Sequence, residues 1–296
     1  GGDALKANTT AANNTAVGKA ALQANTTGTH NTAVGSGALD ASTTGSDLTA
    51  VGYNVLGANT TGYSNVGVGG SATYLAASLS TNTTGFGNSG LGSGALAGNT
   101  TGSSNVGVGR QSMYANTTGS NNTGIGSDTL KTNTTGSNNT ALGSGADVGA
   151  NNLTNATAIG NNAIVSASNK IRLGDANVTS IEGQVSFSSA SDRRLKDNIK
   201  STKYGLETIL KLVPVDYILK SNGLKQIGFI AQDIKPIIPE AVNGIEGDIQ
   251  KGETLAITYT AIIPILTKAI QEQEAKIKKQ NELIQKLILR IESLEK

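Results

Sequence analysis

The first half of the chain repeats an aliphatic residue followed by glycine at intervals of 17 residues. The exception is a step of 23 residues between Val68 and Leu91, which predicts a six-residue insertion near residues 71–76. A phase kept through so many steps is typical of stacked coils, because each coil buries its apolar side chain against the next. The repeat therefore predicts a β-solenoid over residues 1–165. The aliphatic positions are Val17, Val34, Val51, Val68, Leu91, Val108, Ile125, Leu142 and Ile159.

Two further landmarks keep the same phase: an Asn-Thr-Thr triplet, and a larger apolar residue five positions after the aliphatic one. Seventeen residues suit one coil of two short strands and two turns, with glycine at positive φ and Asn and Thr side chains in turn hydrogen bonds. Disorder is the alternative, because Asn, Thr, Gly and Ser dominate, but a disordered tract needs no fixed apolar positions. The triplets begin at Asn8, Asn25, Asn59, Asn82, Asn99, Asn116 and Asn133, with Ser42 as a variant, and the larger apolar residues are Leu22, Leu39, Leu56, Leu96, Met113 and Leu130.

A different period governs the last 36 residues, where isoleucine recurs every seven positions. Isoleucine at the a positions, with Leu or Gln at d, predicts a five-heptad coiled coil of about 48 Å. An amphipathic helix packed on its own domain is the alternative. Ile at a with Leu at d favours two strands, whereas residues 290–295 resemble a short trimerisation motif, so we expect three. The trimerisation residues are Ile263, Ile270, Ile277, Ile284, Arg290, Ile291, Leu294 and Glu295.

Composition separates the two ends of the chain. Residues 1–150 contain four Lys or Arg and five Asp, so 44 − 9 = 35 charged residues lie in the remainder. We expect a shaft over 1–165, junction strands at 170–175 and 184–187 within 166–190, a small α+β domain over 191–260, and the coiled coil over 261–296. Within the α+β domain we expect a helix over 204–212 and strands over 215–219, 226–231 and 255–259.

The same composition excludes several classes of function. The absence of cysteine excludes thiol catalysis, and the single histidine, His30, argues against metal clusters and Ser-His-Asp chemistry. A net charge of +2 shows no preference for nucleic acid, and no apolar stretch is long enough to span a membrane. The Asp residues share no phase, which disfavours a calcium-binding roll. We expect no metal, no cofactor, and a chain that begins inside a longer protein.

The repeats carry the first of two family resemblances. The units Asn31-Thr32-Ala33-Val34-Gly35 and Asn139-Thr140-Ala141-Leu142-Gly143 resemble the heads of trimeric autotransporter adhesins and the shafts of phage tail fibres. Those families form trimeric β-rolls. This resemblance, and the small apolar content of the repeat, lead us to expect a multimeric fibre.

Four motifs in the C-terminal region carry the second resemblance. They are Ser191-Asp192-Arg193-Arg194-Leu195-Lys196, Ile227-Gly228-Phe229-Ile230-Ala231-Gln232-Asp233, Pro239-Glu240 and Leu255-Ala256-Ile257-Thr258-Tyr259. Their order resembles the endosialidase-type intramolecular chaperone domain of phage tail spikes and fibres. The resemblance implies a domain that trimerises, templates folding of the shaft and cuts itself off before the motif serine. Ser191 would be the nucleophile and Lys196 the base, so the scissile bond would join Ala190 to Ser191.

The chemistry of these residue types fits that role. A serine hydroxyl needs an adjacent base, and a neutral lysine can serve where no histidine is near. Burial or neighbouring cations must first lower the lysine pKa, and Arg193 and Arg194 could contribute, with Asp192 as an orienting group. Attack of Ser191 Oγ on the Ala190 carbonyl would give an ester that water hydrolyses. We expect one intramolecular cut and no turnover on a foreign substrate.

These observations predict a homotrimeric tail-fibre or tail-spike fragment in an extracellular virion, which would bind a host surface receptor, either glycan or protein. The alternatives are a bacterial cell-surface or injection-system adhesin that retains the chaperone, and an ice-binding protein whose threonine rows match an ice lattice.

Overall fold

The computed structural model describes residues 1–71, 75–185, 188–220, 223–249 and 253–295. The chain divides into two compact units, residues 1–178 and 179–296.

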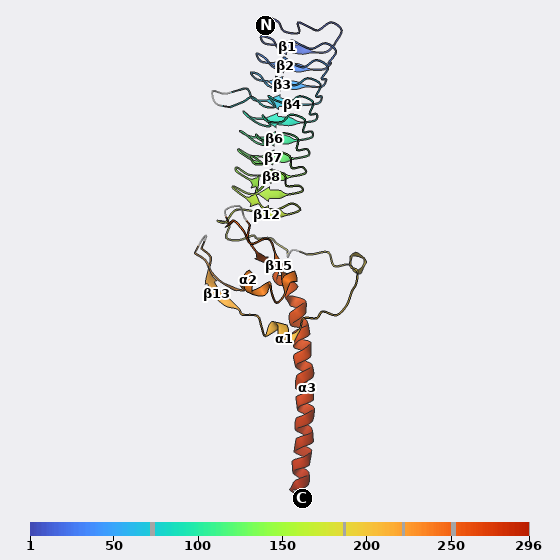
Figure 1. The fold of residues 1–296 in the computed structure, drawn as a ribbon, viewed down its shortest axis with the longest axis vertical. Coiled ribbons are helices and arrows are strands. Elements are labelled where there is room, and N and C mark those ends of the chain that lie inside the picture. Colours follow the sequence, from blue (N-terminus) through green and yellow to red (C-terminus); the bar gives the residue numbers. More distant parts are fainter. Residues whose placement is uncertain (72–74, 186–187, 221–222, 250–252, 296) are drawn as a thin grey trace. The chain divides into compact units, whose positions relative to one another are not determined.

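The first unit is a β-solenoid, as the repeat predicts (Figure 1). Each coil contributes one three-residue strand to a ten-stranded parallel sheet, in the order β1 to β8, β10 and β12. Most strands pair with the residues one repeat further on, so that Ala33 lies opposite Ala50. Between β4 and β5 the register instead joins Val66 to Ser89, which confirms that the extra six residues are an insertion in one coil. The strands are β1 Thr15–Val17, β2 Thr32–Val34, β3 Thr49–Val51, β4 Val66–Val68, β5 Ser89–Leu91, β6 Val106–Val108, β7 Thr123–Ile125, β8 Thr140–Leu142, β10 Thr157–Ile159 and β12 Ile171–Leu173.

The row of aliphatic residues before glycine lies on the outside of the solenoid, so the prediction that it is buried was wrong. Val34 is 37% exposed and Ile125 42%. Side chains alternate across a strand, and in strands β1 to β8 and β10 it is the central Ala or Gly that faces inward. The interior is narrow at this point, because a Cβ on Gly67 would lie 2.5 Å from Val55 Cγ1. Only the smallest residues therefore fit the inward position.

The solenoid core is formed by the other apolar row, five residues further on, together with small alanines. Leu22, Leu39, Leu56, Leu96, Met113 and Leu130 are all fully buried, and Leu79 completes the row after the insertion. Each coil thus closes on a core of its own chain. The small apolar content of the repeat is consequently no evidence that several chains share one core.

Most coils have one strand where two were predicted. Among the described residues, a second strand forms only at the C-terminal end of the solenoid, where β9 Asp147–Val148 pairs with β11 Ile164–Val165. Elsewhere the core leucine takes a left-handed conformation, with φ of 51° at Leu22 and 55° at Leu39, which interrupts a strand. That backbone conformation costs about 1–2 kcal/mol, whereas burial of a leucine side chain contributes about 1.5–3 kcal/mol. Burial of the leucine can therefore offset the cost of its left-handed backbone.

Asparagine side chains form two buried ladders along the solenoid. In the first, Asn99 Nδ2 donates to Asn82 Oδ1 at 2.8 Å and to the Gly102 carbonyl at 2.9 Å. In the second, Asn105 Nδ2 donates to the Gly119 carbonyl, and Asn105 Oδ1 accepts from the backbone amide of Asn122. The prediction that the triplets supply turn hydrogen bonds is confirmed. Both ladders change in one coil, where Ser42 and Leu48 replace asparagine.

The first junction strand, predicted at 170–175, is present as β12, which pairs with β10. Of the second, predicted at 184–187, residues 184 and 185 form a bend, and residues 186 and 187 lie outside the described part of the chain.

The second unit is a small α+β domain followed by a long helix, as predicted. Its core comprises Ile234, Ile238, Ala241, Ile262 and Ile265. The helix predicted over 204–212 is limited to the four residues of α1, and the strand predicted over 226–231 ends at Gly228, where α2 follows. The elements are η1 Arg193–Leu195, α1 Leu206–Ile209, β13 Val215–Ile218, β14 Lys225–Gly228, α2 Ala231–Ile234, η2 Pro239–Ala241, β15 Val242–Asn243, β16 Ala256–Ile257, η4 Tyr259–Ala261 and α3 Ile263–Leu294.

Helix α3 is 32 residues long and confirms the predicted C-terminal helix (Figure 1). Only Ile265 and Ala269 are buried along it, and both lie away from the a and d positions. The a residues stay exposed, for example Ile270 at 65% and Ile284 at 50%. The seam of the heptad repeat therefore does not pack on its own domain. None of the described helices combines the length and apolar character that a membrane span requires.

Candidate autoproteolytic site

Ser191 and Lys196 lie side by side, with Lys196 Nζ donating to Ser191 Oγ at 2.6 Å. A short helical turn, η1, brings them together. Asp192 caps its start by accepting from the Arg194 amide at 2.8 Å, and the Lys196 amide closes the turn on the Arg193 carbonyl. Five residues of extended chain would instead separate the two by about 16 Å.

The polar residues between them form their own contacts. Arg194 pairs with the Asp192 carboxylate at 2.7 Å, and this contact holds the pKa of Asp192 below its usual value and raises the pKa of Arg194. The charge of Arg194 is thus directed at Asp192. Arg193 belongs to the same turn and is exposed.

Ser191 and Lys196 bring a hydroxyl and an amine into contact, but no other described part of the chain covers them. Residues 188–201 are exposed throughout, Ala190 and Ser191 among them. A lysine amine becomes an effective base when it is desolvated, because desolvation disfavours the ammonium form. In a single chain, residues 188–201 therefore place the Lys196 amine beside the Ser191 hydroxyl but leave both in contact with water.

The other three motifs meet around the core of the second unit. The Tyr259 hydroxyl accepts from the Phe229 amide at 3.2 Å, and the rings of the two residues stack at 6.2 Å between centroids. Thr258 Oγ1 accepts from Asn243 Nδ2 at 2.7 Å. Tyr204 donates to Glu240 at 2.7 Å, and this hydrogen bond lowers the pKa of Glu240. These motif residues hold the fold of the domain together.

One contact between helices α1 and α3 was not predicted from the sequence. Glu272 accepts from the Leu206 amide at 2.8 Å and so caps α1. The signal for it was a second stripe on the helix, Ile265, Ala269 and Glu272, at the i, i+4 and i+7 spacing of one helix face.

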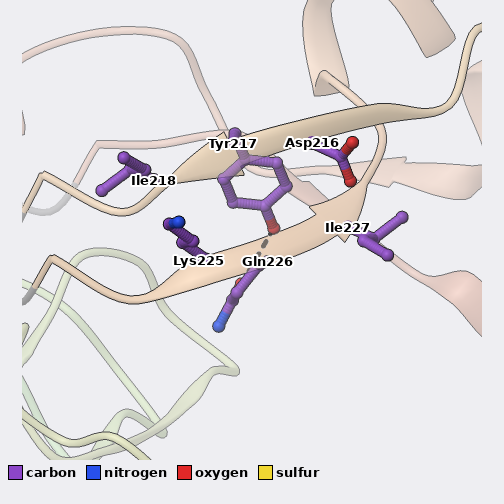
Figure 2. A pocket seen from close by; sticks show the side chains of 6 residues that line it. All are labelled: Asp216, Tyr217, Ile218, Lys225, Gln226 and Ile227. Carbon is purple, nitrogen blue, oxygen red and sulfur yellow. Dashed lines mark hydrogen bonds between the residues drawn. The ribbon is translucent and has the colours of Figure 1, made fainter.

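A surface hollow in the second unit follows the β13–β14 hairpin (Figure 2). Tyr217 spans the two strands by donating to Gln226 at 2.9 Å. Ile218 and Ile227 are 59% and 79% exposed beside it. Neither Ser191 nor Lys196 lines this hollow. Among the described residues, no group of three His, Asp or Glu side chains is arranged to hold a metal ion.

Comparison with known proteins identifies the C-terminal region. Residues 191–243 match the family described as chaperone of endosialidase, which confirms the resemblance that the motifs predicted. Over 95 residues the chain is 37% identical to long tail fiber protein Gp37 of Enterobacteria phage M1, and equally to that of Enterobacteria phage Ox2. These matches cover 30% of this chain and 37% of each relative. No solved structure matches the chain.

Proposed function

We propose that this chain, which carries a chaperone-of-endosialidase domain, is part of a homotrimeric phage tail fibre. The solenoid would be the shaft, and the C-terminal unit would align three chains and then cut itself off between Ala190 and Ser191. The similarity to two phage tail fibre proteins supports this role over that of a bacterial adhesin. A fibre of this kind acts outside the cell and meets a receptor on the host surface.

The exposed seam of α3 is the observation that carries the proposal. Along 32 residues, the isoleucines at a and the leucines at d face solvent in the single chain. Complete burial of each such side chain contributes about 1.5–3 kcal/mol, so association through the seam is strongly favourable. Arg290 at g and Glu295 at the following e position can pair between neighbouring helices, and the Gln273 and Gln280 layers fix the register.

The outer face of the solenoid sheet supports the same assembly. Its aliphatic row, extended by Leu173 of β12, runs over ten strands, which at about 4.8 Å per strand make an apolar stripe of about 43 Å. Soluble proteins rarely leave a continuous stripe of this length exposed, because its burial is favourable. Three shafts that turn these faces toward one another would cover it. Because successive coils are nearly alike, a slip of one coil would bury similar surface, and a C-terminal clamp prevents it.

The cut follows from the chemistry of the dyad. Ser191 Oγ attacks the Ala190 carbonyl carbon as Lys196 Nζ removes the hydroxyl proton, and the proton passes to the Ser191 nitrogen as the peptide bond breaks. The product is an ester between Ala190 and Ser191 with a free amine. Water hydrolyses the ester, which releases the Ala190 carboxylate and restores the serine hydroxyl. Because the segment is exposed in one chain, we expect the cut only after assembly excludes water from Lys196.

The intact mass of the purified protein tests the proposal. Wild type should give two pieces, one ending at Ala190 and one beginning at Ser191. Ser191→Ala and Lys196→Ala should stay whole, while Ser189→Ala, the matched control on the same exposed segment, should be cut like wild type. An uncut wild-type trimer would remove the protease from the proposal and leave the clamp. A cut in Lys196→Ala would remove Lys196 as the base.

A further inference from the structure

Two aromatic side chains stack on the outside of the solenoid. The rings of Tyr63 and Phe86 lie 4.9 Å apart between centroids and are parallel within 2°. They come from neighbouring coils and remain 48% and 41% exposed. Each begins a short segment that leads into a strand, three residues before Val66 and Ser89, and thus lies beside the sheet face.

The solenoid does not need aromatic residues at this position. In other coils a hydroxyl occupies the equivalent site and accepts an amide hydrogen from the preceding coil. The Thr29 amide donates to Ser46 Oγ, the Phe86 amide to Ser103 Oγ, and the Ser103 amide to Ser120 Oγ, at 3.0–3.2 Å. Tyr63 and Phe86 offer the amides of Ser46 and Tyr63 no hydroxyl next to the backbone. The stack therefore replaces two hydrogen bonds between coils. One aromatic pair contributes about 0.5–1.5 kcal/mol and each hydrogen bond about as much, so the exchange does not stabilise the solenoid.

The surroundings of the pair are rich in hydroxyl groups and poor in charge. The exposed Thr61 and Thr84 precede the two rings by two positions, and Ser64 and Gly87 follow them. Asp47 is the acidic residue in the adjoining coil, where it lies 3.8 Å from His30. A carboxylate on that side repels an anionic ligand.

We propose that the Tyr63–Phe86 pair is a binding site for a neutral carbohydrate. The C–H bonds on one face of a pyranose ring are weakly positive and fit the negative face of an aromatic ring. The threonine hydroxyls can hydrogen-bond the sugar hydroxyls, and binding sites commonly combine an apolar surface with a few such polar groups. The inference rests on the proposed role at a cell surface and names the class of receptor that the shaft would contact.

Titration calorimetry and saturation-transfer NMR on the full chain test this site. The probes are unbranched neutral oligosaccharides, namely chito-, malto- and cello-oligosaccharides, with oligosialic acid as the anionic comparison. We expect one neutral series to bind with a dissociation constant in the millimolar to high micromolar range, as is usual for a small exposed site. The double variant Tyr63→Ser/Phe86→Ser should weaken binding at least about tenfold, which corresponds to about 1.4 kcal/mol.

The variant is designed to keep the fold, since serine is the residue of this row in other coils and restores the amide acceptors. Its melting temperature should equal or exceed that of wild type. Tyr114→Ser removes an exposed aromatic ring elsewhere on the solenoid and should leave binding unchanged.

The proposal is overturned if no neutral series binds, if oligosialic acid binds more tightly, or if the double variant binds as wild type does. It is also overturned if the double variant changes only the number of chains in the assembly, because another copy would then cover the rings. Trimer mass and self-cleavage are measured separately, so failure of the carbohydrate site is distinguishable from failure of the proposed fibre.

Discussion

Asn99 donates through Nδ2 to Oδ1 of Asn82, one coil away, at a distance of 2.8 Å, and both side chains are fully buried. Asn116 donates in the same way to Asn99 Oδ1, so Asn99 is both a donor and an acceptor within the ladder. Buried amides are costly unless they are paired, and here each repeat supplies the partner of the next. The ladder is a polar spine inside a solenoid that contains few large apolar residues. It also places these asparagines out of reach of glycosylation in the folded chain.

Removal of one amide from this spine should destabilise the solenoid strongly. Asn99→Ala leaves Asn82 Oδ1 buried without a partner, while Asn116 Nδ2 loses one of its two acceptors and keeps the Gly119 carbonyl. An unpaired buried group costs about 1–3 kcal/mol, and each further hydrogen bond that is lost about 0.5–1.5 kcal/mol. We expect a loss of about 2–5 kcal/mol, measured as a lower midpoint in urea unfolding followed by circular dichroism. Thr101→Ala, at an exposed position of the same coil, should change the free energy of unfolding by less than about 0.5 kcal/mol. Equal effects of the two substitutions would show that the ladder contributes nothing specific.

The coil that departs from both ladders offers a test of coupling. Ser42 Oγ and Asn25 Oδ1 are buried and have no partner within the described residues, and Leu48 fills the site of the second asparagine. A Cβ on Gly45 would lie 2.9 Å from both Ser42 Oγ and Leu48 Cδ1, so the two side chains share one crowded space. An asparagine at position 42 alone would crowd the Leu48 side chain. An asparagine at position 48 alone would leave the first ladder interrupted at Ser42.

We therefore expect Ser42→Asn and Leu48→Asn to be more favourable together than the sum of the single changes predicts. The coupling free energy should be about 1–3 kcal/mol in the stabilising direction, obtained from a double-mutant cycle of unfolding free energies. Gly45 and the rest of the coil are unchanged in all four proteins. Additive effects would mean that the two positions are independent despite their shared neighbour.

The seam of α3 leads to a prediction about assembly. Ile277→Lys places a charge at a central a position, which three chains would bury together at high cost. Since Ile277 is exposed in the single chain, its own domain should still fold. Light scattering after size-exclusion chromatography should give the mass of one chain at micromolar concentration, with self-cleavage lost as well. Lys279→Ala, on the outer face of the helix, should keep the mass of three chains. A trimer that survives Ile277→Lys would mean that the interface lies elsewhere.

The period of 17 residues was readable because the same contacts recur in every coil. The period could not say which of the two apolar rows faces inward. The sequence predicted burial of the Val34 row, whereas in the structure the Leu39 row is buried and the Val34 row is exposed. The deciding signal is size, since the residue between Thr32 and Val34, and its equivalent in each coil up to Ala158, is Ala or Gly. Small residues in the middle of a strand mark the side that meets a close neighbour.

The spacing of Ser191 and Lys196 carried less information than the Asp192 between them. Asp is a favoured capping residue, and here it starts the turn that brings the lysine back to the serine. The stripe of Ile265, Ala269 and Glu272 marks a second face of α3, but no local pattern names Leu206, 66 residues away, as the partner of Glu272. Contacts of this length depend on the tertiary arrangement of the domain.

Asp147 should make the stability of the solenoid depend on pH. Burial raises its pKa above 3.8, and hydrogen bonds from Thr132 and the Val148 amide offset this only in part. The folded chain thus holds the proton more tightly than the unfolded chain does. Protonation of Asp147 therefore stabilises the fold, fully below the unfolded pKa of about 3.9, and this contribution is lost as the pH rises through the folded pKa.

We expect the stability of wild type relative to Asp147→Asn, which does not titrate, to increase as the pH falls from 7 toward 4. Thermal melts of both proteins over this range measure the difference, and subtraction removes the titration of all other groups. Asp175→Asn serves as a control of opposite sign, since hydrogen bonds from Asn177 lower the pKa of that exposed carboxyl. A difference between wild type and Asp147→Asn that stays constant with pH would mean that the carboxylate is as well solvated in the solenoid as in the unfolded chain.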